Sequence, residues 1–202
     1  MTTTHILGYP RIGANRELKR AQEAYWKGEI DQQALLAAGS QVRSKSWLAQ
    51  QGAGLALTTV GDFAWYDQVL NHSLMFGVIP ERFAEGAADN KLDQYFRLAR
   101  GRAPSGEPVA ASAMTKWFDT NYHYLVPEFS TDQEFTLDSE WLLGEVKEAQ
   151  RLGHNVKPVV IGPLTYLWLG RGVDCAIDLL PKLLPRYVEL LKQLADAAAQ
   201  WV

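Results

Sequence analysis

The sequence has little of what several function classes require. Its 202 residues include one cysteine, Cys175, so no disulfide can form within the chain, which agrees with a reducing compartment. Its 20 basic and 23 acidic residues give a formal net charge of -3, whereas nucleic-acid-binding domains usually carry a strong positive charge. No stretch reaches the roughly 18 apolar residues that a membrane span needs, and no signal-peptide pattern opens the chain. We therefore expect a cytoplasmic protein that binds neither nucleic acid nor a membrane.

Motifs for metal binding and for common catalytic mechanisms are also absent from the sequence. The four histidines are far apart and, together with Cys175, show none of the HxxC, CxxC or HExxH spacings of metal sites. No P-loop, no GxSxG turn and no GxGxxG loop after a strand is present. We therefore predict no metal site and no cofactor site in this chain, and any anion site must be a local feature.

The composition is that of an ordinary globular protein. Apolar residues make up 47% and charged residues 21%, and the 16 glycines and 9 prolines are scattered rather than gathered in low-complexity tracts. A chain of this length can bury most of its apolar surface. Because nothing in the sequence suggests two cores, we expect residues 1–202 to form a single domain.

Strand and helix patterns alternate along the chain. Short β-branched or apolar runs predict strands at residues 5–7, 55–63 and 156–163, and a strand end within residues 114–129. Apolar residues at helical spacing predict helices, the first with Asn15 as its N-cap, over residues 16–28, 31–51, 66–76, 91–99, 136–152 and 177–200. Such an alternation is typical of parallel βαβ units, as in doubly wound sheets and (β/α)8 barrels.

The loops after the predicted strands favour a barrel over a doubly wound sheet. Polar residues that could serve a site follow several different strands, as in barrel enzymes: Arg11, Asp62 and Lys116. Only about four β/α units fit into the chain, whereas a closed barrel needs eight. We expect an α/β fold made of the first part of a (β/α)8 TIM-type barrel, in a chain that looks truncated. Its open strand edges would allow self-association.

The run RELKR at residues 16–20 predicts an anion site. Arg16, Lys19 and Arg20 share one face at the beginning of the first helix. Cations there oppose the helix macrodipole at a cost on the order of 0.3–1 kcal/mol each. A bound carboxylate or phosphate would offset that cost. The alternative is a solvated first turn with Glu17 as the counter-charge, and the pattern alone does not decide between the two.

The mixed segment at residues 114–129 predicts one wall of a cleft. Its polar side chains interrupt the aromatic ones with neither strand nor helix period, as where polar and aromatic groups converge on a ligand. Lys116 would be its charged contact, or would only extend from a strand end to water. Asn121 and His123 are further candidates, and Asp62, at the end of another predicted strand, is a fourth.

The sequence resembles one known family over essentially its whole length. The motifs, in chain order, are ILGYPRIGANRELKRAQEAYWKG, GDFAWYDQVL, GRAPSGEP, MTKWFDTNYHYLVPEF and VKPVVIGPLTYLWLG. They are similar to the N-terminal domain of cobalamin-independent methionine synthases. This resemblance implies an enzyme of two barrels: the C-terminal barrel binds zinc and homocysteine, and the N-terminal barrel helps to hold the folate with its polyglutamate tail.

The resemblance also implies roles for single residues. Arg16, Glu17, Leu18 and Lys19 match a folate-binding segment of the family, and Lys116 matches its other N-terminal folate contact. The implied reaction transfers a methyl group from 5-methyltetrahydropteroyltriglutamate to zinc-bound homocysteine, which makes methionine. Zinc and homocysteine would bind in the barrel that is missing here, so we expect this chain to hold no catalytic residue and to be inactive alone. The alternative is a non-catalytic module that binds folate or polycarboxylates, or that self-associates.

Overall fold

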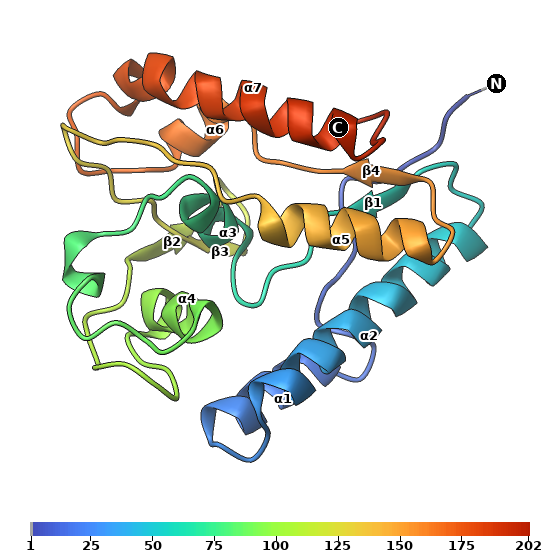
Figure 1. Cartoon of the computed structure of the whole chain (residues 1–202), viewed down its shortest axis with the longest axis horizontal. Helices are drawn as coiled ribbons and strands as arrows, with labels where there is room; N and C mark the ends of the chain where they lie inside the picture. The colour runs from blue at the N-terminus through green and yellow to red at the C-terminus, as the bar shows by residue number, and fades with distance from the viewer. Residues whose placement is uncertain (1) are drawn as a thin grey trace. The chain divides into compact units, whose positions relative to one another are not determined.

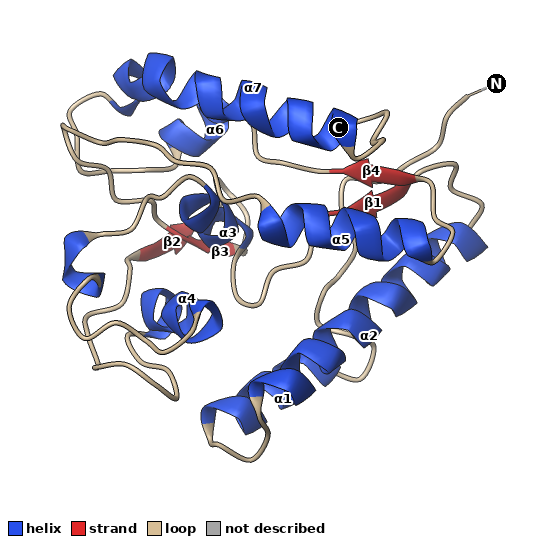
Figure 2. Ribbon diagram, in the orientation of Figure 1, coloured by secondary structure: helices blue, strands red, loops and turns tan. Residues whose placement is uncertain are grey.

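The computed structural model describes residues 2–202, and these residues divide into two units, each with its own packing (Figure 1). Unit 1 comprises residues 2–65, 140–160 and 192–202, and unit 2 comprises residues 66–139 and 161–191. Both units mix helices with short strands, so the fold is α/β (Figure 2). The single domain expected over residues 1–202 stays a prediction.

Unit 1 combines a parallel strand pair with helices that pack beside it. In chain order its elements are α1 (Glu17–Trp26), α2 (Gln32–Gly52), β1 (Thr58–Val60), α5 (Glu140–Arg151) and β4 (Val156–Pro158). Every residue of the paired strands is buried, which is typical of parallel strands covered on both faces. The strands predicted over residues 55–63 and 156–163 are therefore present, although each is shortened to three residues.

Helix α1 packs against α2 around a small apolar core. Leu18 of α1 and Val42 of α2 are buried together with Phe63, and Trp65 packs against this cluster. A Cβ atom at Gly39 of α2 would overlap the Trp65 ring, so only glycine lets the indole approach the helix so closely. This core fixes the position of α1 within unit 1.

Residues 5–7 do not form the strand that the sequence predicts. The N–H groups of Ala56 and Leu57 both donate to the carbonyl of Thr4, at 3.0 and 3.1 Å. The hydroxyl of Thr59 donates to the carbonyl of Ile6 at 2.6 Å. A strand ladder needs regular hydrogen bonds between backbone groups. Here two backbone N–H groups share the Thr4 carbonyl, and the donor to the Ile6 carbonyl is a side-chain hydroxyl. The segment therefore lies beside β1 without being a strand.

Unit 2 joins a β-hairpin to a set of helices. In chain order its elements are α3 (Gln68–Met75), the 3₁₀ turn η1 (Glu81–Phe83), α4 (Lys91–Arg100), β2 (Met114–Lys116), β3 (His123–Leu125), α6 (Pro163–Trp168), the 3₁₀ turn η2 (Ala176–Leu179) and α7 (Leu180–Asp196), whose last residues belong to unit 1. Strands β2 and β3 pair antiparallel, so residues 114–125 of the segment over residues 114–129 form a hairpin and not the end of a single strand.

Aromatic side chains fill the core of unit 2. The buried rings of Phe76 and Tyr166 have centroids 5.7 Å apart, and those of Phe129 and Tyr166 are 5.8 Å apart. His72 lies beside them, and its Nε2 accepts a hydrogen bond from the Ile161 N–H at 2.9 Å. Burial lowers the pKa of His72 to about 4, so the imidazole is neutral at pH 7. It acts as a core residue.

The strands within residues 2–202 form one parallel pair and one antiparallel pair, and they do not close into a barrel. The α/β prediction is thus confirmed, while the partial barrel stays a prediction. In the same part of the chain, no helix is both long enough and apolar enough to cross a membrane.

Candidate functional site

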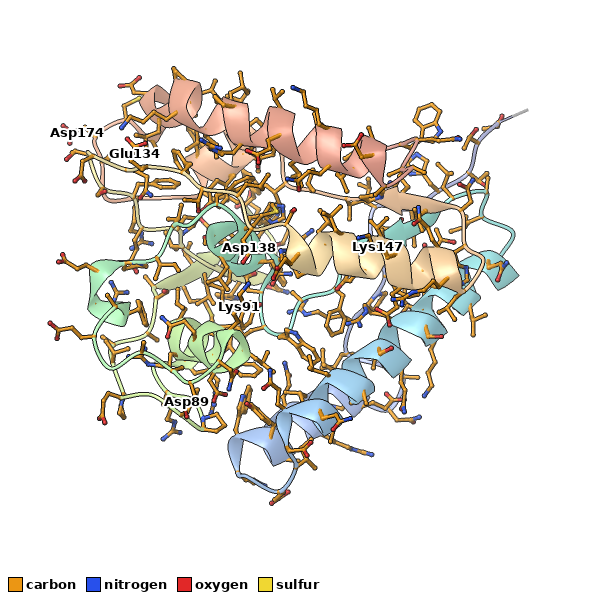
Figure 3. The ribbon with its side chains drawn as sticks, viewed as in Figure 1. Asp89, Lys91, Glu134, Asp138, Lys147 and Asp174 are labelled. Atoms are coloured by element: carbon orange, nitrogen blue, oxygen red, sulfur yellow. The ribbon has the colours of Figure 1, made fainter. Side chains whose placement is uncertain are left out.

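Charged side chains are spread over the surface of the chain (Figure 3). Many form exposed ion pairs, such as Lys91 with Asp138, whose Nζ and Oδ2 atoms lie 2.8 Å apart. Pairs of this kind contribute at most about 1 kcal/mol and indicate no function. A functional site is better sought where charges are unbalanced, or where they are buried.

Helix α1 begins at Glu17, and Arg16 rather than the predicted Asn15 is its N-cap residue. Arg16 has a left-handed backbone, with φ 61°, and its side chain makes no capping bond. Instead, the Glu17 carboxylate reaches back to accept a hydrogen bond from the Asn15 N–H at 2.9 Å, and it lies 3.4 Å from Lys45 Nζ. Its own N–H, the Asn15 N–H and Lys45 together lower the pKa of Glu17. Glu17 therefore secures the start of the helix.

The cations at the start of α1 are only partly neutralised. Lys19 Nζ lies 3.7 Å from Glu23 Oε1, and both side chains are about half exposed. Among residues 2–202, Arg16 and Arg20 form no ion pair, and both are exposed. This end of the helix thus presents positive charge to solvent, as an anion site requires.

Leu18 differs from its neighbours because it faces inward. Its side chain is 1% exposed and belongs to the core with Val42 and Phe63. The Arg43 guanidinium lies over the Phe63 ring of this core, 4.9 Å from the ring centroid. Leu18 therefore anchors the charged turn and does not itself face solvent.

Asp62 holds the loop that leads to α1. It follows β1, and its Oδ2 accepts a hydrogen bond from the Tyr9 N–H at 2.6 Å. Three residues before Tyr9, the Ile6 carbonyl accepts hydrogen bonds from Lys157 Nζ at 3.0 Å and from the Thr59 hydroxyl at 2.6 Å. Burial raises the pKa of Asp62, while the Tyr9 N–H and Lys157 oppose that rise. Asp62 is thus a positioning residue for the segment before α1.

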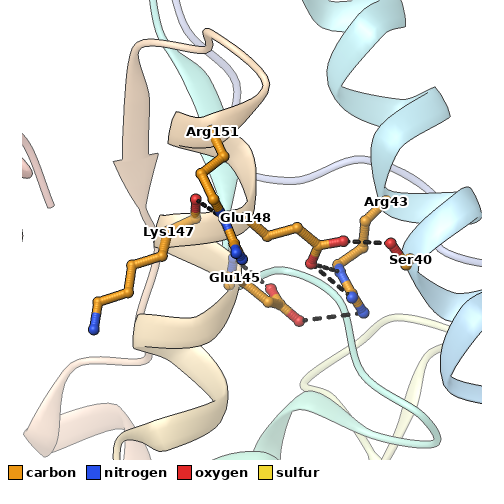
Figure 4. Close-up of polar contacts among 7 residues, drawn as sticks. Ser40, Arg43, Glu145, Lys147, Glu148 and Arg151 are labelled. Carbon is orange, nitrogen blue, oxygen red and sulfur yellow. Dashed lines mark hydrogen bonds and ion pairs between the residues drawn. The ribbon is translucent and has the colours of Figure 1, made fainter.

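A partly buried ionic cluster, which includes the buried Glu145, lies between α2 and α5 (Figure 4). Glu145 Oε2 accepts a hydrogen bond from the Gly61 N–H at 3.1 Å, and Oε1 lies 3.9 Å from Arg43 Nη1. Arg43 donates to Glu148 Oε2 from Nε at 3.0 Å and from Nη2 at 2.7 Å, and the Ser40 hydroxyl donates to Oε1 at 2.5 Å. Burial raises the pKa of Glu145 to about 8, although Arg43 opposes this.

The sequence motifs missed this cluster because its members are about 100 residues apart in the chain. One signal was present. Glu145 lies on the apolar face of its predicted helix, between Leu142 and Val146, and a carboxyl group there must be buried with a partner. Its partner on α2, Arg43, carries no comparable signal.

In unit 2, Lys116 ends β2 and lies opposite His123 of β3. The hairpin closes through a hydrogen bond from the Trp117 N–H to the Tyr122 carbonyl at 2.7 Å. His123 Nδ1 donates to the Asn121 carbonyl at 3.0 Å. Lys116, Asn121 and His123 are all exposed, so each can reach a ligand from solvent.

Asp67 connects two elements of unit 2 through its carboxylate. It is the N-cap of α3, and its Oδ2 accepts from the Leu70 N–H at 3.0 Å. The same oxygen accepts from the Leu125 N–H at 3.0 Å, and Oδ1 accepts from the Tyr122 hydroxyl at 2.6 Å. The Tyr95 hydroxyl donates to its carbonyl at 2.9 Å. One carboxylate thus joins α3 to the hairpin.

The predicted site residues fall into two groups. Unit 1 contains Arg16, Glu17, Leu18, Lys19 and Asp62, and unit 2 contains Lys116, Asn121 and His123. Within residues 2–202, no group of three or more His, Cys, Asp or Glu side chains is arranged to hold a metal ion. The side chains described here therefore do not fit the zinc ion that the resemblance implies for the whole enzyme.

Comparison with known protein families shows to which family the chain belongs. The family described as cobalamin-independent synthase, N-terminal domain, matches residues 3–202. The chain belongs to this family. A Proteus mirabilis protein is 56% identical over 201 residues, which cover 98% of this chain and 27% of the relative.

Other curated relatives give the same result. A Sodalis glossinidius protein is 54% identical over 202 residues, covering 98% of this chain and 27% of its own length. A Photobacterium profundum protein is 54% identical over 204 residues, covering all of this chain and 26% of its own length. All three relatives are named 5-methyltetrahydropteroyltriglutamate–homocysteine methyltransferase. The chain spans about a quarter of the length of these relatives, and the family resemblance of the sequence motifs is confirmed.

Proposed function

We propose that this chain supplies the part of a 5-methyltetrahydropteroyltriglutamate–homocysteine methyltransferase that binds the glutamate tail of the folate. The observation that carries the proposal is the exposed positive charge of Arg16 and Lys19 at the start of α1, in a chain more than 50% identical to enzymes of that name. A triglutamate tail is a string of carboxylates. Exposed cations at the start of a helix are suited to bind it.

In this proposal the residues at the start of α1 have two kinds of role. Arg16 and Lys19 contact carboxylates of the tail, while Glu17 and Leu18 fix the turn that carries them, through the Asn15 N–H and the apolar core. Each exposed ion pair contributes roughly 0.5 kcal/mol, so two or three together change affinity by about tenfold. Lys116 is a further tail contact in this proposal, and Asp62, Asn121 and His123 are further cleft residues.

The methyl transfer of the whole enzyme needs groups that we place outside this chain. The sulfur of homocysteine attacks the methyl carbon, the bond from that carbon to folate N5 breaks, and N5 keeps the electron pair and takes a proton. We place homocysteine and zinc in the part of the relatives that this chain does not span. We therefore propose that residues 1–202 bind the folate but, alone, transfer no methyl group. Residues 1–202 would then be a single incomplete N-terminal domain.

For the fold, we propose that the chain is the first part of a (β/α)8 barrel. Two features support this: β1 and β4 pair in parallel, and their flanking helices, α2 and α5, pack beside them. A third is an apolar stripe on α7, where Leu184, Val188 and Leu191 are 45–48% exposed at helical spacing. A stripe of this kind usually packs against another element.

The same stripe favours a second candidate, a self-associating module. Gel filtration of the chain over a range of concentrations tests this, with Val188→Lys as the variant. Self-association predicts that the wild-type chain elutes earlier as concentration rises and that Val188→Lys does not. A wild-type chain that stays monomeric at every concentration rules this candidate out.

Calorimetric titration tests the tail-binding proposal. The chain is titrated with 5-methyltetrahydrofolate carrying one glutamate and, separately, three glutamates. We expect the triglutamate form to bind about tenfold more tightly, and the difference to shrink as salt is added. Equal affinity for the two forms would refute the proposal. Adding zinc and homocysteine to the triglutamate complex should produce no methionine, and turnover would refute the placement of the catalytic groups.

A further inference from the structure

Unit 1 carries a surface groove that the proposed function does not use. It lies between α2 and α5 and has a volume of about 540 Å³. Apolar atoms make up most of its exposed surface, and the side chains in its walls also bring hydroxyl, amide and charged groups to it: Ser40, Gln41, Ser44, Lys45, Glu148, Arg151 and Leu152. None of these residues belongs to the motifs that predict folate binding.

The only carboxylate in the wall of this groove, among residues 2–202, is already fully engaged. Glu148 Oε1 accepts from the Ser40 hydroxyl at 2.5 Å, and Oε2 accepts two hydrogen bonds from Arg43, at 3.0 and 2.7 Å. The Arg43 guanidinium therefore neutralises the negative charge of Glu148. A ligand in the groove meets hydrogen-bond donors rather than a free carboxylate.

The two cations of the groove keep donors available. Lys45 is 69% exposed in its side chain, and the one ion pair that it forms among residues 2–202, to Glu17, is long at 3.4 Å. Arg151 donates from Nε to the Lys147 carbonyl at 3.2 Å, and neither of its Nη groups forms an ion pair within residues 2–202. Ser44 and Gln41 add side-chain donors on the α2 wall.

The buried carboxyl of Glu145, next to the groove, adds little negative charge at neutral pH. Burial raises the pKa of Glu145 to about 8, so this carboxyl is mostly protonated at pH 7. The charged groups that face it are Arg43 from α2, Asp62 from the loop after β1, and Glu148 from α5 itself. Around the groove, positive charge therefore exceeds negative charge at neutral pH.

We propose that the groove between α2 and α5 binds a small anion that bears two or more phosphate or carboxylate groups, with Lys45 and Arg151 as its cationic contacts. The chemistry follows from the walls. Two separate cations match an anion with separate charges better than a single halide does, and the hydroxyl and amide donors complete its oxygen shell. Arg151 can donate to one carboxylate or phosphate in bidentate fashion through its free Nη groups.

The proposal is tested by calorimetric titration of the chain with pyrophosphate and with citrate, at low ionic strength and pH 7. The variants are Lys45→Gln and Arg151→Gln. The matched control is Lys147→Gln, which removes the same charge from α5 at an exposed position that does not line the groove (Figure 4). All three positions are exposed, so these variants should fold, which circular dichroism checks.

We expect saturable binding of pyrophosphate, citrate or both, and their relative affinity shows whether the groove prefers phosphate or carboxylate. Lys45→Gln and Arg151→Gln should each weaken binding about tenfold, because each removes a charge-assisted hydrogen bond. Lys147→Gln should weaken it less than twofold. The proposal is overturned if neither pyrophosphate nor citrate shows saturable binding. An equal loss in all three variants also overturns it, because that result shows general attraction to net charge and not a site.

Discussion

The buried carboxyl of Glu145 makes a prediction about how stability depends on pH. Its Oε2 accepts from the Gly61 N–H at 3.1 Å, and its one cationic neighbour, Arg43, is 3.9 Å away. Because burial outweighs that neighbour, the folded-state pKa rises from 4.5 to about 8. The folded chain then holds this proton more tightly than the unfolded chain. The stability gained is present below about pH 4.5 and is lost as pH rises through 8.

The size of this effect follows from the shift. One pKa unit corresponds to about 1.4 kcal/mol. Applied to a group that moves from 4.5 to about 8, the linkage relation gives a loss of about 2–3 kcal/mol in the free energy of unfolding between pH 6 and pH 9. Glu145→Gln keeps the side-chain volume and an acceptor for the Gly61 N–H, but it cannot ionise. The variant should therefore lack this loss.

Urea unfolding followed by circular dichroism measures both proteins at several pH values and constant ionic strength. We expect similar stability near pH 6 and a growing advantage of the variant towards pH 9. Asp62→Asn is measured in the same way for comparison with Glu145→Gln. Burial also raises the pKa of Asp62, but the Asp62 carboxyl lies nearer the surface. Parallel pH curves for wild type and Glu145→Gln would refute the reasoning, because they would mean that Glu145 is ionised across this range.

Two further predictions concern the supports of the candidate site residues. Leu18→Ala leaves a cavity against Val42 and Phe63, so it should lower the free energy of unfolding by about 2–5 kcal/mol in urea titrations. A loss below about 1 kcal/mol would show that this core does not anchor α1. Asp67→Ala leaves the buried Leu70 and Leu125 N–H groups unpaired and should cost at least about 2 kcal/mol, whereas Asp67→Asn, which keeps an acceptor, should cost less. Equal losses for both variants would contradict the hydrogen-bond account.

The helices were predictable from the sequence because apolar spacing directly reports the face that a helix buries. The helix expected over residues 31–51 is observed at Gln32–Gly52, and that expected over residues 91–99 at Lys91–Arg100. In both, an Asp or Asn side chain caps the first turn, through Asp31 and Asn90. Local chemistry sets such boundaries, so a local pattern finds them.

The strands and the hairpin were less predictable, because they depend on partners far away in the chain. β1 pairs with β4, about 100 residues later, and only the residues that pair become a strand. The hairpin turn requires a left-handed backbone at Phe118, with φ 48°, a conformation that bulky residues rarely adopt. No glycine or asparagine occupies position 118 itself, so the sequence does not mark where the backbone becomes left-handed.

The candidate site was predictable where it rests on one segment and not where it rests on several. The run at residues 16–20 predicted three cations on one helix face, and Lys19 and Arg20 do lie in the first turns of α1. Arg16 precedes the helix with a left-handed backbone, so the helical spacing does not place it on that face, although it is exposed. The error at its N-cap came from Glu17, whose carboxylate takes the Asn15 N–H. The contact between Asp62 and the Tyr9 N–H joins residues 53 positions apart, which no local pattern reveals.

The central claim is that the start of α1 binds the glutamate tail of the folate, and the ratio of affinities for the triglutamate and monoglutamate forms tests it most directly. This ratio is measured for the wild-type chain, for Arg16→Ala with Lys19→Ala, and for Lys27→Ala as the control at the other end of α1. We predict that the double variant loses most of the roughly tenfold preference while monoglutamate binding and the control are unchanged. A double variant that keeps the full preference for three glutamates would contradict the account.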